Sequence, residues 1–317
     1  MQKKATKKLK MTVNEKTFEE GFEDFIVSCR VKNLSEVTIK GYKNEIYYSF
    51  EKFFDTTQPI SCINSSLVDK YILYLQERGL KDVTVNTHIR ELRSILYYFM
   101  EHGWLNSFKI KLIKAESVII ETYSDSELKL LLAKPNMKKC TFAEYRNWVI
   151  CNFLIATGCR SNTLLNIQTD DIDFENEVVI YKKTKNKKQQ VIPLTKSLIP
   201  ILREYIQRIE EGYLFTNSFG EPMTNSTLGH NLRDYNLRRS VTTTGIHRFR
   251  HTFAKKYLLN GGDVFRLQKL LGHSDMTVVK NYVNMFTDDL KQDFDKFNPL
   301  ESVMIKNTKI KMNKKNE

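Results

Sequence analysis

Four side chains that could hold an anion lie between residues 245 and 284 of the 317-residue chain. They are His247, Arg250, His273 and Tyr282. Two imidazoles and a guanidinium with no carboxylate among them make a poor metal site, because a guanidinium donates hydrogen bonds and cannot act as a ligand. The same groups suit an anion such as a phosphate, with a phenol beside it.

Three short helices are expected to bring these side chains together. The first spans residues 246–259 and ends at a pair of glycines. It carries His247 and Arg250 on one face, because they stand three residues apart. The second spans residues 264–271 and stops at Gly272, just before the second histidine. The third spans residues 277–284 and carries the tyrosine. Two turns would fold these helices back on one another, so that the four polar side chains converge.

Two patterns that could indicate a metal ion have better explanations. His247 and His251 are four residues apart, as in the zinc motif HExxH, but Arg248 stands where that motif has its glutamate. Three carboxylates before an expected strand could bind a divalent cation, although a polar turn explains them without one: Asp170, Asp171 and Asp173. The chain has no P-loop pattern either. We therefore expect no metal, no cofactor and no ATP chemistry.

The formal net charge of the chain is +13, and much of it lies at the two ends. Residues 1–10 hold five lysines, and residues 301–317 hold five lysines against two glutamates. Basic tails are therefore expected at residues 1–11 and 301–317, and such tails suit any polyanionic partner. The body of the chain must supply the evidence for a specific one.

Composition also indicates where the protein works. No apolar run approaches the length of a membrane span, and no apolar region follows the lysines at the start as it would in a signal peptide. The five cysteines include no CxxC pair, which is typical of free thiols in a reducing compartment. We expect a cytoplasmic protein without membrane contact and, at this length, with two domains.

Apolar residues at helical spacing run through residues 12–107 and predict a helical bundle. Ser35 suits the cap of its second helix, and further helices are expected over residues 67–77 and 84–100. One polar face of the last helix could line a phosphate backbone or could simply face solvent. The sequence favours neither reading of these five residues: Thr84, Asn86, Thr87, Arg90 and Arg93.

Residues 108–122 lack a clear period and are expected to link the bundle to a second domain at residues 123–300. Within that domain two β-type runs, residues 178–181 and 190–194, flank a lysine-rich hairpin tip. Lysines at a tip usually face solvent, but a flexible tip could also swing one of them, Lys185, into a groove. The expected fold class is thus mainly α with a small β-sheet.

A strongly apolar helix is expected over residues 142–156 and ends near Gly158, which leaves Arg160 at the start of the next helix. A helix N-terminus is a favourable place for a phosphate, so an arginine there is well placed to hold one. If it stood alone, it would be an ordinary surface arginine. Further along, we expect a helix over residues 196–210 and a short strand over residues 214–216.

Four segments resemble, in sequence and in order, the motifs of the tyrosine recombinase family, the phage-integrase group that includes Xer and Cre. They are ATGCRSNTLLNIQTDDID, the hairpin KKTKNKKQQVIPL, HRFRHTFA and LLGHSDMTVVKNY, and the resemblance extends over nearly the whole chain. By position, the resemblance implies six catalytic residues: the first arginine Arg160, the hairpin lysine Lys185, the pair His247 and Arg250, the second histidine His273 and the nucleophile Tyr282.

The resemblance also implies an architecture and a partner. The N-terminal helical domain would be a SAM-like core-binding domain, and the second an α+β catalytic domain. Double-stranded DNA would be the partner, held by a homo-tetramer on paired recombination sites. Three features depart from the family pattern. Thr163 stands where an acidic residue often supports the first arginine, the hairpin tip holds several lysines, and no arm-binding domain is expected before the core.

The chemistry of the residues agrees with these roles. The Tyr282 phenol can attack a DNA phosphate and form a covalent 3′-phosphotyrosyl intermediate, while Arg160 and Arg250 hold the phosphate oxygens. Either histidine can accept the phenol proton or orient the phosphate, and Lys185 can protonate the departing 5′-oxygen. Because the intermediate keeps the energy of the broken bond, the reaction needs neither ATP nor a metal.

We expect a site-specific DNA recombinase, an integrase that integrates or excises a mobile element. The basic tails and Thr163 favour a mobile element over the Xer-type resolution of chromosome or plasmid dimers, which is one alternative. A type IB topoisomerase-like activity would share the chemistry but reseal the same strand. A DNA-binding regulator without catalysis is the alternative from a different class.

An apolar stripe follows the expected nucleophile helix. Phe286, Leu290, Phe294 and Phe297 stand at helical spacing, opposite charged residues. Such a helix could lie on its own domain or dock in the catalytic domain of a neighbouring subunit. The sequence leaves both open.

Overall fold

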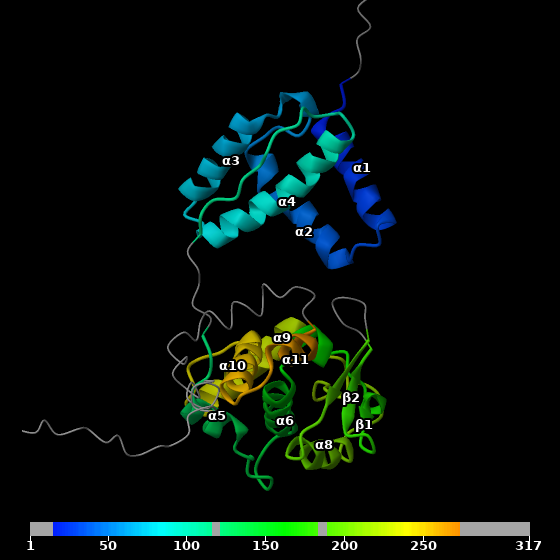
Figure 1. Ribbon diagram of the computed structural model, residues 1–317, viewed down its shortest axis with the longest axis vertical. Helices are drawn as coiled ribbons and strands as arrows, with labels where there is room; N and C mark the ends of the chain where they lie inside the picture. Colours follow the sequence, from blue (N-terminus) through cyan, green and yellow to red (C-terminus); the bar gives the residue numbers. More distant parts are fainter. Residues whose placement is uncertain (1–14, 116–120, 183–188, 273–317) are drawn as a thin grey trace, which may run out of the picture. The chain divides into compact units, whose positions relative to one another are not determined.

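A computed structural model describes residues 15–115, 121–182 and 189–272. The chain divides into two compact units, Met1–Val118 and Ile119–Glu317. Helices make up most of the described residues, and one small three-stranded sheet accompanies them (Figure 1). The expected fold class, mainly helical with a small sheet, is confirmed. No helix in the described parts of the chain is both long and apolar enough to cross a membrane.

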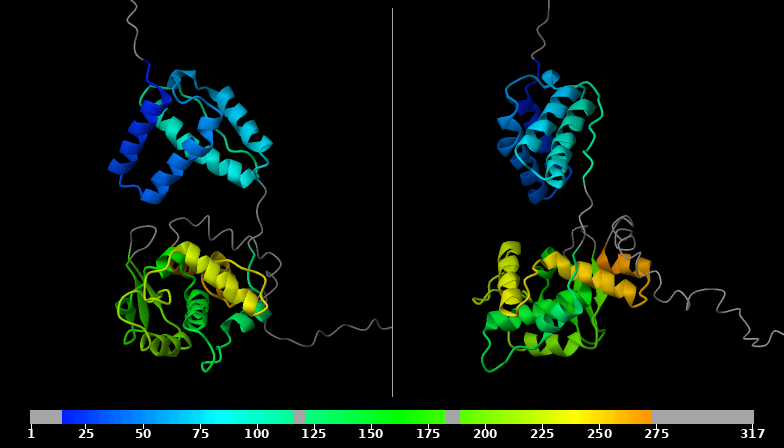
Figure 2. Two further views of the ribbon diagram at one scale, coloured as in Figure 1. Left: turned by 180° about the vertical axis from the view of Figure 1, so that it is seen from behind. Right: turned by 90° about the vertical axis from the view of Figure 1, so that its left-hand side faces the viewer.

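The described part of the N-terminal unit is a helical bundle (Figure 2). Its four α-helices are α1 (Phe18–Val31), α2 (Glu36–Tyr48), α3 (Ser65–Glu77) and α4 (Asp82–Glu101). Two short 3-10 turns, Phe50–Lys52 and Ile60–Cys62, join α2 to α3. The side chains of Thr17, Ser35 and Asn64 accept hydrogen bonds from the first turns of α1, α2 and α3, whose N–H groups have no partner within the helix. In the core the Phe18 ring of α1 contacts both Phe50 of the first 3-10 turn and Phe99 of α4.

The chain beyond α4 packs with this bundle. Ile110 is buried, and the backbone N–H of Ile110 donates to the Tyr97 hydroxyl over 3.3 Å. The Asn86 carboxamide donates to the carbonyl of Ile113 over 2.9 Å and accepts from its N–H over 3.0 Å. The first part of the segment expected as a linker, residues 108–122, therefore contributes to the core of the N-terminal unit.

The C-terminal unit is built around one buried helix, α6 (Phe142–Thr157), which contacts four other helices. Its buried residues lie on all sides, because α5 (Asp125–Leu132), α8 (Leu198–Ile206), α9 (Asn225–Arg238) and α10 (Ile246–Leu259) pack around it (Figure 1). The short α7 (Ser161–Leu164) follows α6 directly, and α11 (Val264–Leu271) packs against α10.

The sheet of this unit is antiparallel, in the order β1-β2-β3. Its strands are β1 (Ile172–Asp173), β2 (Val178–Tyr181) and β3 (Gln190–Pro193). Val179 pairs with both Ile172 and Ile192, and all three side chains are buried in the core of the unit. The lysine-rich connection from β2 to β3 is therefore held at both ends by a paired and buried hairpin base.

One local prediction differs from the structure, and one helix was not predicted. The strand expected over residues 214–216 is wrong: Tyr213 and Thr216 form only isolated bridges, to Gln168 and Pro222. Helix α9 was not anticipated, although its sequence holds a signal. The hydroxyl of Thr224 caps its first turn, and apolar side chains at helical spacing follow: Leu228, Leu232 and Tyr235.

Candidate active site

The C-terminal ends of α6 and α11 form the framework of the site. Each helix ends at a glycine in the left-handed region, Gly158 with φ 62° and Gly272 with φ 60°. A β-carbon on Gly158 would lie 2.4 Å from Cδ1 of Phe253, so only glycine fits this turn. The turn at Gly158 places Arg160 directly before α7.

Arg250 is buried between these two helix ends, with 5% of its surface exposed. Its Nη1 donates to the carbonyl of Gly158 over 2.8 Å, and its Nη2 donates to the carbonyl of Leu271 over 2.7 Å. Carbonyl groups at a helix C-terminus carry partial negative charge and lack partners within the helix. They can therefore stabilise a buried guanidinium without neutralising it as a carboxylate would.

Arg160 reaches the same end of α11. It is half-buried, and its Nη2 donates to the carbonyl of Gly272 over 3.3 Å. Thr163, which stands where the family often has an acidic residue, is buried. A backbone carbonyl is thus one support of Arg160 in this chain.

Gln190, the first residue of β3, is a third contact to the end of α11. Its Nε2 donates to the carbonyls of Lys269 and Leu270 over 2.5 and 2.9 Å. These two bonds connect the base of the lysine-rich hairpin to the helix that precedes His273. The role of Gln190 was not predicted, because a strand pattern does not show which polar side chain will contact a distant helix end.

The two histidines of α10 lie in a positively charged environment. His247 reaches solvent, yet partial burial of its ring and the charges of Arg250 and Arg160 lower its pKa. Burial, His247 and Arg250 lower the pKa of His251 to about 4. Both imidazoles are therefore mostly neutral at neutral pH, so that His247 can accept a proton. In the described parts of the chain no group of three His, Cys, Asp or Glu residues could hold a metal ion.

The structure brings three of the six expected catalytic residues, Arg160, His247 and Arg250, to one place. The other three, Lys185, His273 and Tyr282, lie outside the described residues. Two of them, His273 and Lys185, stand close to described residues in the sequence. Gly272, which precedes His273, accepts from Arg160, and β2 and β3 flank the segment that contains Lys185.

The three aspartates near the hairpin serve as turn and ion-pair residues. Asp171 is buried, accepts from the N–H of Gln168 over 2.9 Å and pairs with Lys182 over 2.5 Å, which raises the pKa of that lysine. Asp173 accepts from the backbone of the turn that follows β1, which lowers its pKa, and Asp170 is exposed. The polar-turn interpretation of these residues is confirmed.

The polar face of α4 is only partly as expected. Thr84, Thr87 and Arg90 are exposed and Arg93 is half-buried. Asn86 requires a correction, because it is buried and both ends of its carboxamide hold Ile113. Neither Arg90 nor Arg93 forms an ion pair within the described part of the chain, so both guanidinium groups are available to a phosphate backbone.

Comparison with known proteins gives two family matches. Residues 123–288 match the phage integrase family, and residues 32–115 match the phage integrase SAM-like domain. Tyrosine recombinase XerD of Staphylococcus haemolyticus is 27% identical over 283 residues, which cover 84% of this chain and 94% of that protein.

Two solved structures share the fold. The Tn1549 transposon integrase in complex with circular intermediate DNA has a TM-score of 0.68 at 20% identity, covering 84% of this chain and 94% of that one. XerH site-specific recombinase bound to a palindromic difH substrate has a TM-score of 0.67 at 19% identity, covering 86% and 83%. The likeness includes both the helical bundle and the C-terminal unit, since it extends over more than four fifths of the chain.

Proposed function

Because this chain belongs to the phage integrase family of tyrosine recombinases, which cleave and rejoin DNA, we propose that it integrates or excises a mobile element at paired DNA sites. The observation that carries the proposal is the cluster at the end of α11. Two arginines and a histidine of lowered pKa meet there, and backbone carbonyls hold both guanidinium groups in place. An anion supplied from outside, the scissile phosphate, would complete the cluster.

The arginines would hold the phosphate. Arg250 is fixed by two carbonyls, so its position is set before the substrate arrives, and Arg160 is directed from the start of α7 to the same helix end. Guanidinium groups bind phosphate oxygens with forked geometry and gain strength as negative charge builds in the transition state. His247, mostly neutral at neutral pH, would orient the phosphate or accept the phenol proton.

The remaining steps fall to Tyr282, His273 and Lys185. The Tyr282 oxygen forms a bond to phosphorus, the bond from phosphorus to the 5′-oxygen breaks, and Lys185 supplies the proton that the 5′-oxygen takes up. The resulting 3′-phosphotyrosyl link retains the energy of the broken bond. Attack by the 5′-hydroxyl of another strand reverses the step, releases Tyr282 and completes one strand exchange.

The helical bundle would hold the other side of the duplex. Thr84, Thr87, Arg90 and Arg93 on α4 offer hydrogen-bond donors and positive charge to a phosphate backbone. We propose that four copies assemble on two paired sites, since strand exchange requires an attacking 5′-hydroxyl from a second cleaved duplex. Assembly brings that hydroxyl to the intermediate.

Resolution of chromosome or plasmid dimers is the second candidate function. It is favoured by the XerD relative, which this chain matches over 94% of that protein's length. The mobile-element function is favoured by the lysine-rich ends of the chain and by Thr163. The two functions use the same chemistry and differ in the DNA sites that are paired.

A nicked suicide substrate tests the proposed chemistry. On such DNA the strand beyond the cleavage point diffuses away, and the wild-type chain should accumulate as a covalent adduct, in excess EDTA as well. Tyr282→Phe should bind the same DNA and form no adduct. A normal adduct yield from Tyr282→Phe would remove the tyrosine from this role, and no adduct from the wild type would favour a DNA-binding regulator.

An assay with two sites distinguishes the remaining functions. A plasmid that carries two ends of the element as direct repeats should yield an excised circle. Relaxation of supercoils without exchange would instead indicate a topoisomerase-like activity. Recombination only between the sites of plasmid or chromosome dimers would indicate the Xer-type role.

A further inference from the structure

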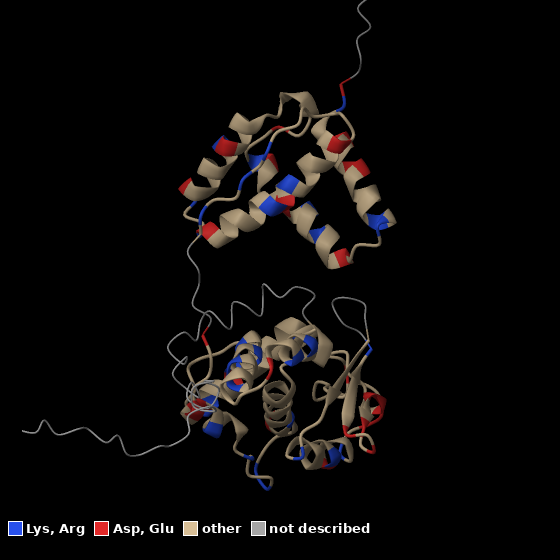
Figure 3. Cartoon of the chain, viewed as in Figure 1, with Lys and Arg blue, Asp and Glu red and all other residues tan. Residues whose placement is uncertain are grey.

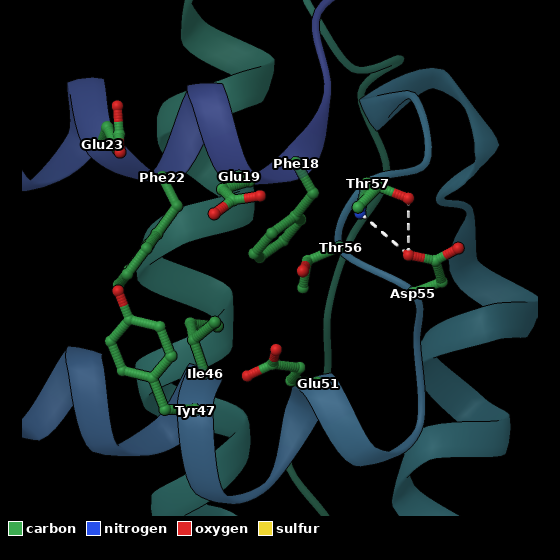
Figure 4. A pocket seen from close by; sticks show the side chains of 10 residues that line it. All are labelled: Phe18, Glu19, Phe22, Glu23, Ile46, Tyr47, Glu51, Asp55, Thr56 and Thr57. Atoms are coloured by element: carbon green, nitrogen blue, oxygen red, sulfur yellow. Dashed lines mark hydrogen bonds between the residues drawn. The ribbon is translucent and has the colours of Figure 1, made fainter.

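The N-terminal unit contains a pocket of about 390 Å³ that recombination chemistry does not explain. Its walls come from α1, from the end of α2, and from the residues that follow it up to Thr57 (Figure 4). We call it the acidic pocket, because four carboxylates line it around an apolar floor that includes Phe18, Phe22 and Ile46. The four acidic residues are Glu19, Glu23, Glu51 and Asp55.

These carboxylates lack a basic partner. None of the four forms an ion pair within the described part of the chain, and only Asp55 has side-chain hydrogen bonds there, to Thr57 and Gln58. Residues 15–115 contain equal numbers of acidic and basic residues, so the bundle is neutral as a whole while its charges are separated. Figure 3 shows Lys and Arg along the middle of α4 and Asp and Glu on the first half of α1.

A buried threonine inside the pocket is a second, independent feature. Thr56 is 9% exposed, and its backbone is fixed because its carbonyl accepts from the N–H of Glu19 over 3.0 Å. Its hydroxyl has no hydrogen-bond partner among the described residues and lies between Phe18 and Glu51 (Figure 4). Glu19 and Glu51 point into the same space from opposite sides. The pocket therefore offers a hydroxyl oxygen and two carboxylates to one ligand.

We propose that the acidic pocket binds residues 3–11 of the same chain and withholds them from DNA. Five lysines lie within the first ten residues, and Leu9 stands between two of them, so this segment pairs an apolar side chain with flanking ammonium groups. That pattern is complementary to an apolar floor with acidic edges. The proposal rests on the DNA binding of the proposed function, but not on which sites are recombined.

The length of the connecting chain permits this docking. Residues 15–17 are held in place, since the Ser61 hydroxyl donates to Glu15 over 2.7 Å and the Lys16 carbonyl accepts from the N–H of Ile60. The five residues from Lys10 to Glu15 can span roughly 16–18 Å when extended. The pocket begins at Phe18, only three residues beyond Glu15, so the segment can turn back and reach the near end of the pocket. The covalent connection also gives a high effective concentration, which lets weak, salt-screened contacts hold.

A four-variant cycle on the full-length protein tests the proposal. The variants are the wild type, Glu19→Gln with Glu51→Gln, a deletion of residues 2–11, and the combination of both changes. The measurement is affinity for random-sequence duplex DNA as a function of salt. Neutralising the pocket should release the lysines, so that affinity rises several-fold and the salt slope steepens by up to about 4. In the deletion background the same two substitutions should change affinity by less than twofold.

Glu36→Gln with Glu77→Gln is the matched control. Both residues are exposed carboxylates of the same bundle outside the pocket, so neutralising them should raise affinity equally with and without the lysine segment. An equal rise for the pocket variant in the two backgrounds would overturn the proposal. Thermal unfolding of each variant shows that the comparison is made between folded proteins.

Zero-length carbodiimide crosslinking gives a second readout. The wild type should yield peptides that join a lysine of residues 3–10 to Glu19 or Glu51 within one chain, and duplex DNA should abolish them. Crosslinks of these lysines only to carboxylates elsewhere would contradict the docking. The same crosslinks found only between two chains would mean that a second copy occupies the pocket.

Discussion

Two histidines, His88 in the N-terminal unit and His247 in the C-terminal unit, have pKa values shifted in opposite directions. His88 on α4 bonds through Nδ1 to Glu45 on α2, whose side chain is fully buried. That hydrogen bond is the main reason why the pKa of His88 is raised. The Tyr71 hydroxyl on α3 also donates to Glu45, over 2.6 Å, so one carboxylate ties three helices together.

His247 has the reverse environment. Its cationic neighbours, Arg250 and Arg160, are stabilised by backbone carbonyls, which carry only partial charge. The comparison shows two uses of buried polar groups. In the cluster around Glu45 the negative and the positive group both belong to the protein, and their contact stabilises the bundle. In the cluster at the end of α11 the described partners of the two guanidinium groups are backbone carbonyls, which leave the positive charge in place for a phosphate.

The largest expected effect is on the rate of DNA cleavage. Arg250→Ala should lower the rate about 100- to 1,000-fold, the usual loss when one transition-state donor is removed. DNA affinity should change far less, because α4 and other basic residues also bind the backbone. Single-turnover cleavage and a binding titration measure both, and Arg233→Ala, at an exposed arginine of α9, is the control. Equal losses in rate and affinity would reduce Arg250 to an ordinary backbone contact.

An intermediate effect is expected on the stability of the bundle. Tyr71→Phe removes a hydrogen bond to the buried Glu45 carboxylate, and such bonds to charged groups typically contribute about 1.5–3 kcal/mol to the free energy of unfolding. Tyr74→Phe on the same helix is the matched control, since no hydrogen bond of its hydroxyl is present in the described part of the chain. Denaturant unfolding should separate the two variants. If both lose the same stability, the network around Glu45 does not hold the bundle.

The smallest effects are expected in the dependence of stability on pH. With rising pH, His88 should lower the stability of its unit and His247 should raise the stability of the other. The pKa of His88 is raised in the folded protein, so protonated His88 stabilises the fold. This stabilisation is fully present below the pKa of histidine in the unfolded chain, near 6.5, and is lost as the pH rises through the pKa of His88 in the folded protein. Glu91, whose pKa burial raises, acts in the same direction at lower pH. For His247, whose pKa is lowered, stability falls instead as pH drops from about 6.5 through the folded value.

Hydrogen exchange of α4 and α10 amides between pH 5.5 and 8 measures these trends in each unit separately. His88→Gln should remove the decline in protection of α4 with rising pH. On α10 the pKa of His251 is lowered as well, to about 4, so His247→Gln should reduce the rise in protection of α10 and His247→Gln with His251→Gln should remove it. If protection changed with pH in the same direction in both helices, the two histidines would not have pKa values shifted in opposite directions.

Sequence patterns predicted the parts of the site that depend on local interactions. The bounds of α10 and α11 agree with expectation because glycines at their ends and apolar spacing are local signals. Asn86 was misplaced for the opposite reason: its helical spacing matched the exposed face, but its partner, Ile113, lies on a segment with no period of its own. The role of Gln190 and the carbonyl support of both arginines arise from tertiary contacts between distant segments, which spacing does not record.

In the proposed reaction the cluster at the end of α11 neutralises the charge of the scissile phosphate. A substrate with one uncharged methylphosphonate at the scissile position tests it directly, since the charge that Arg250 would offset is then missing. On that substrate Arg250→Ala should regain most of the cleavage that it loses on ordinary DNA, relative to the wild type. An equal loss on both substrates would contradict the claim and would leave Arg250 with the purely structural role of joining α6 to α11.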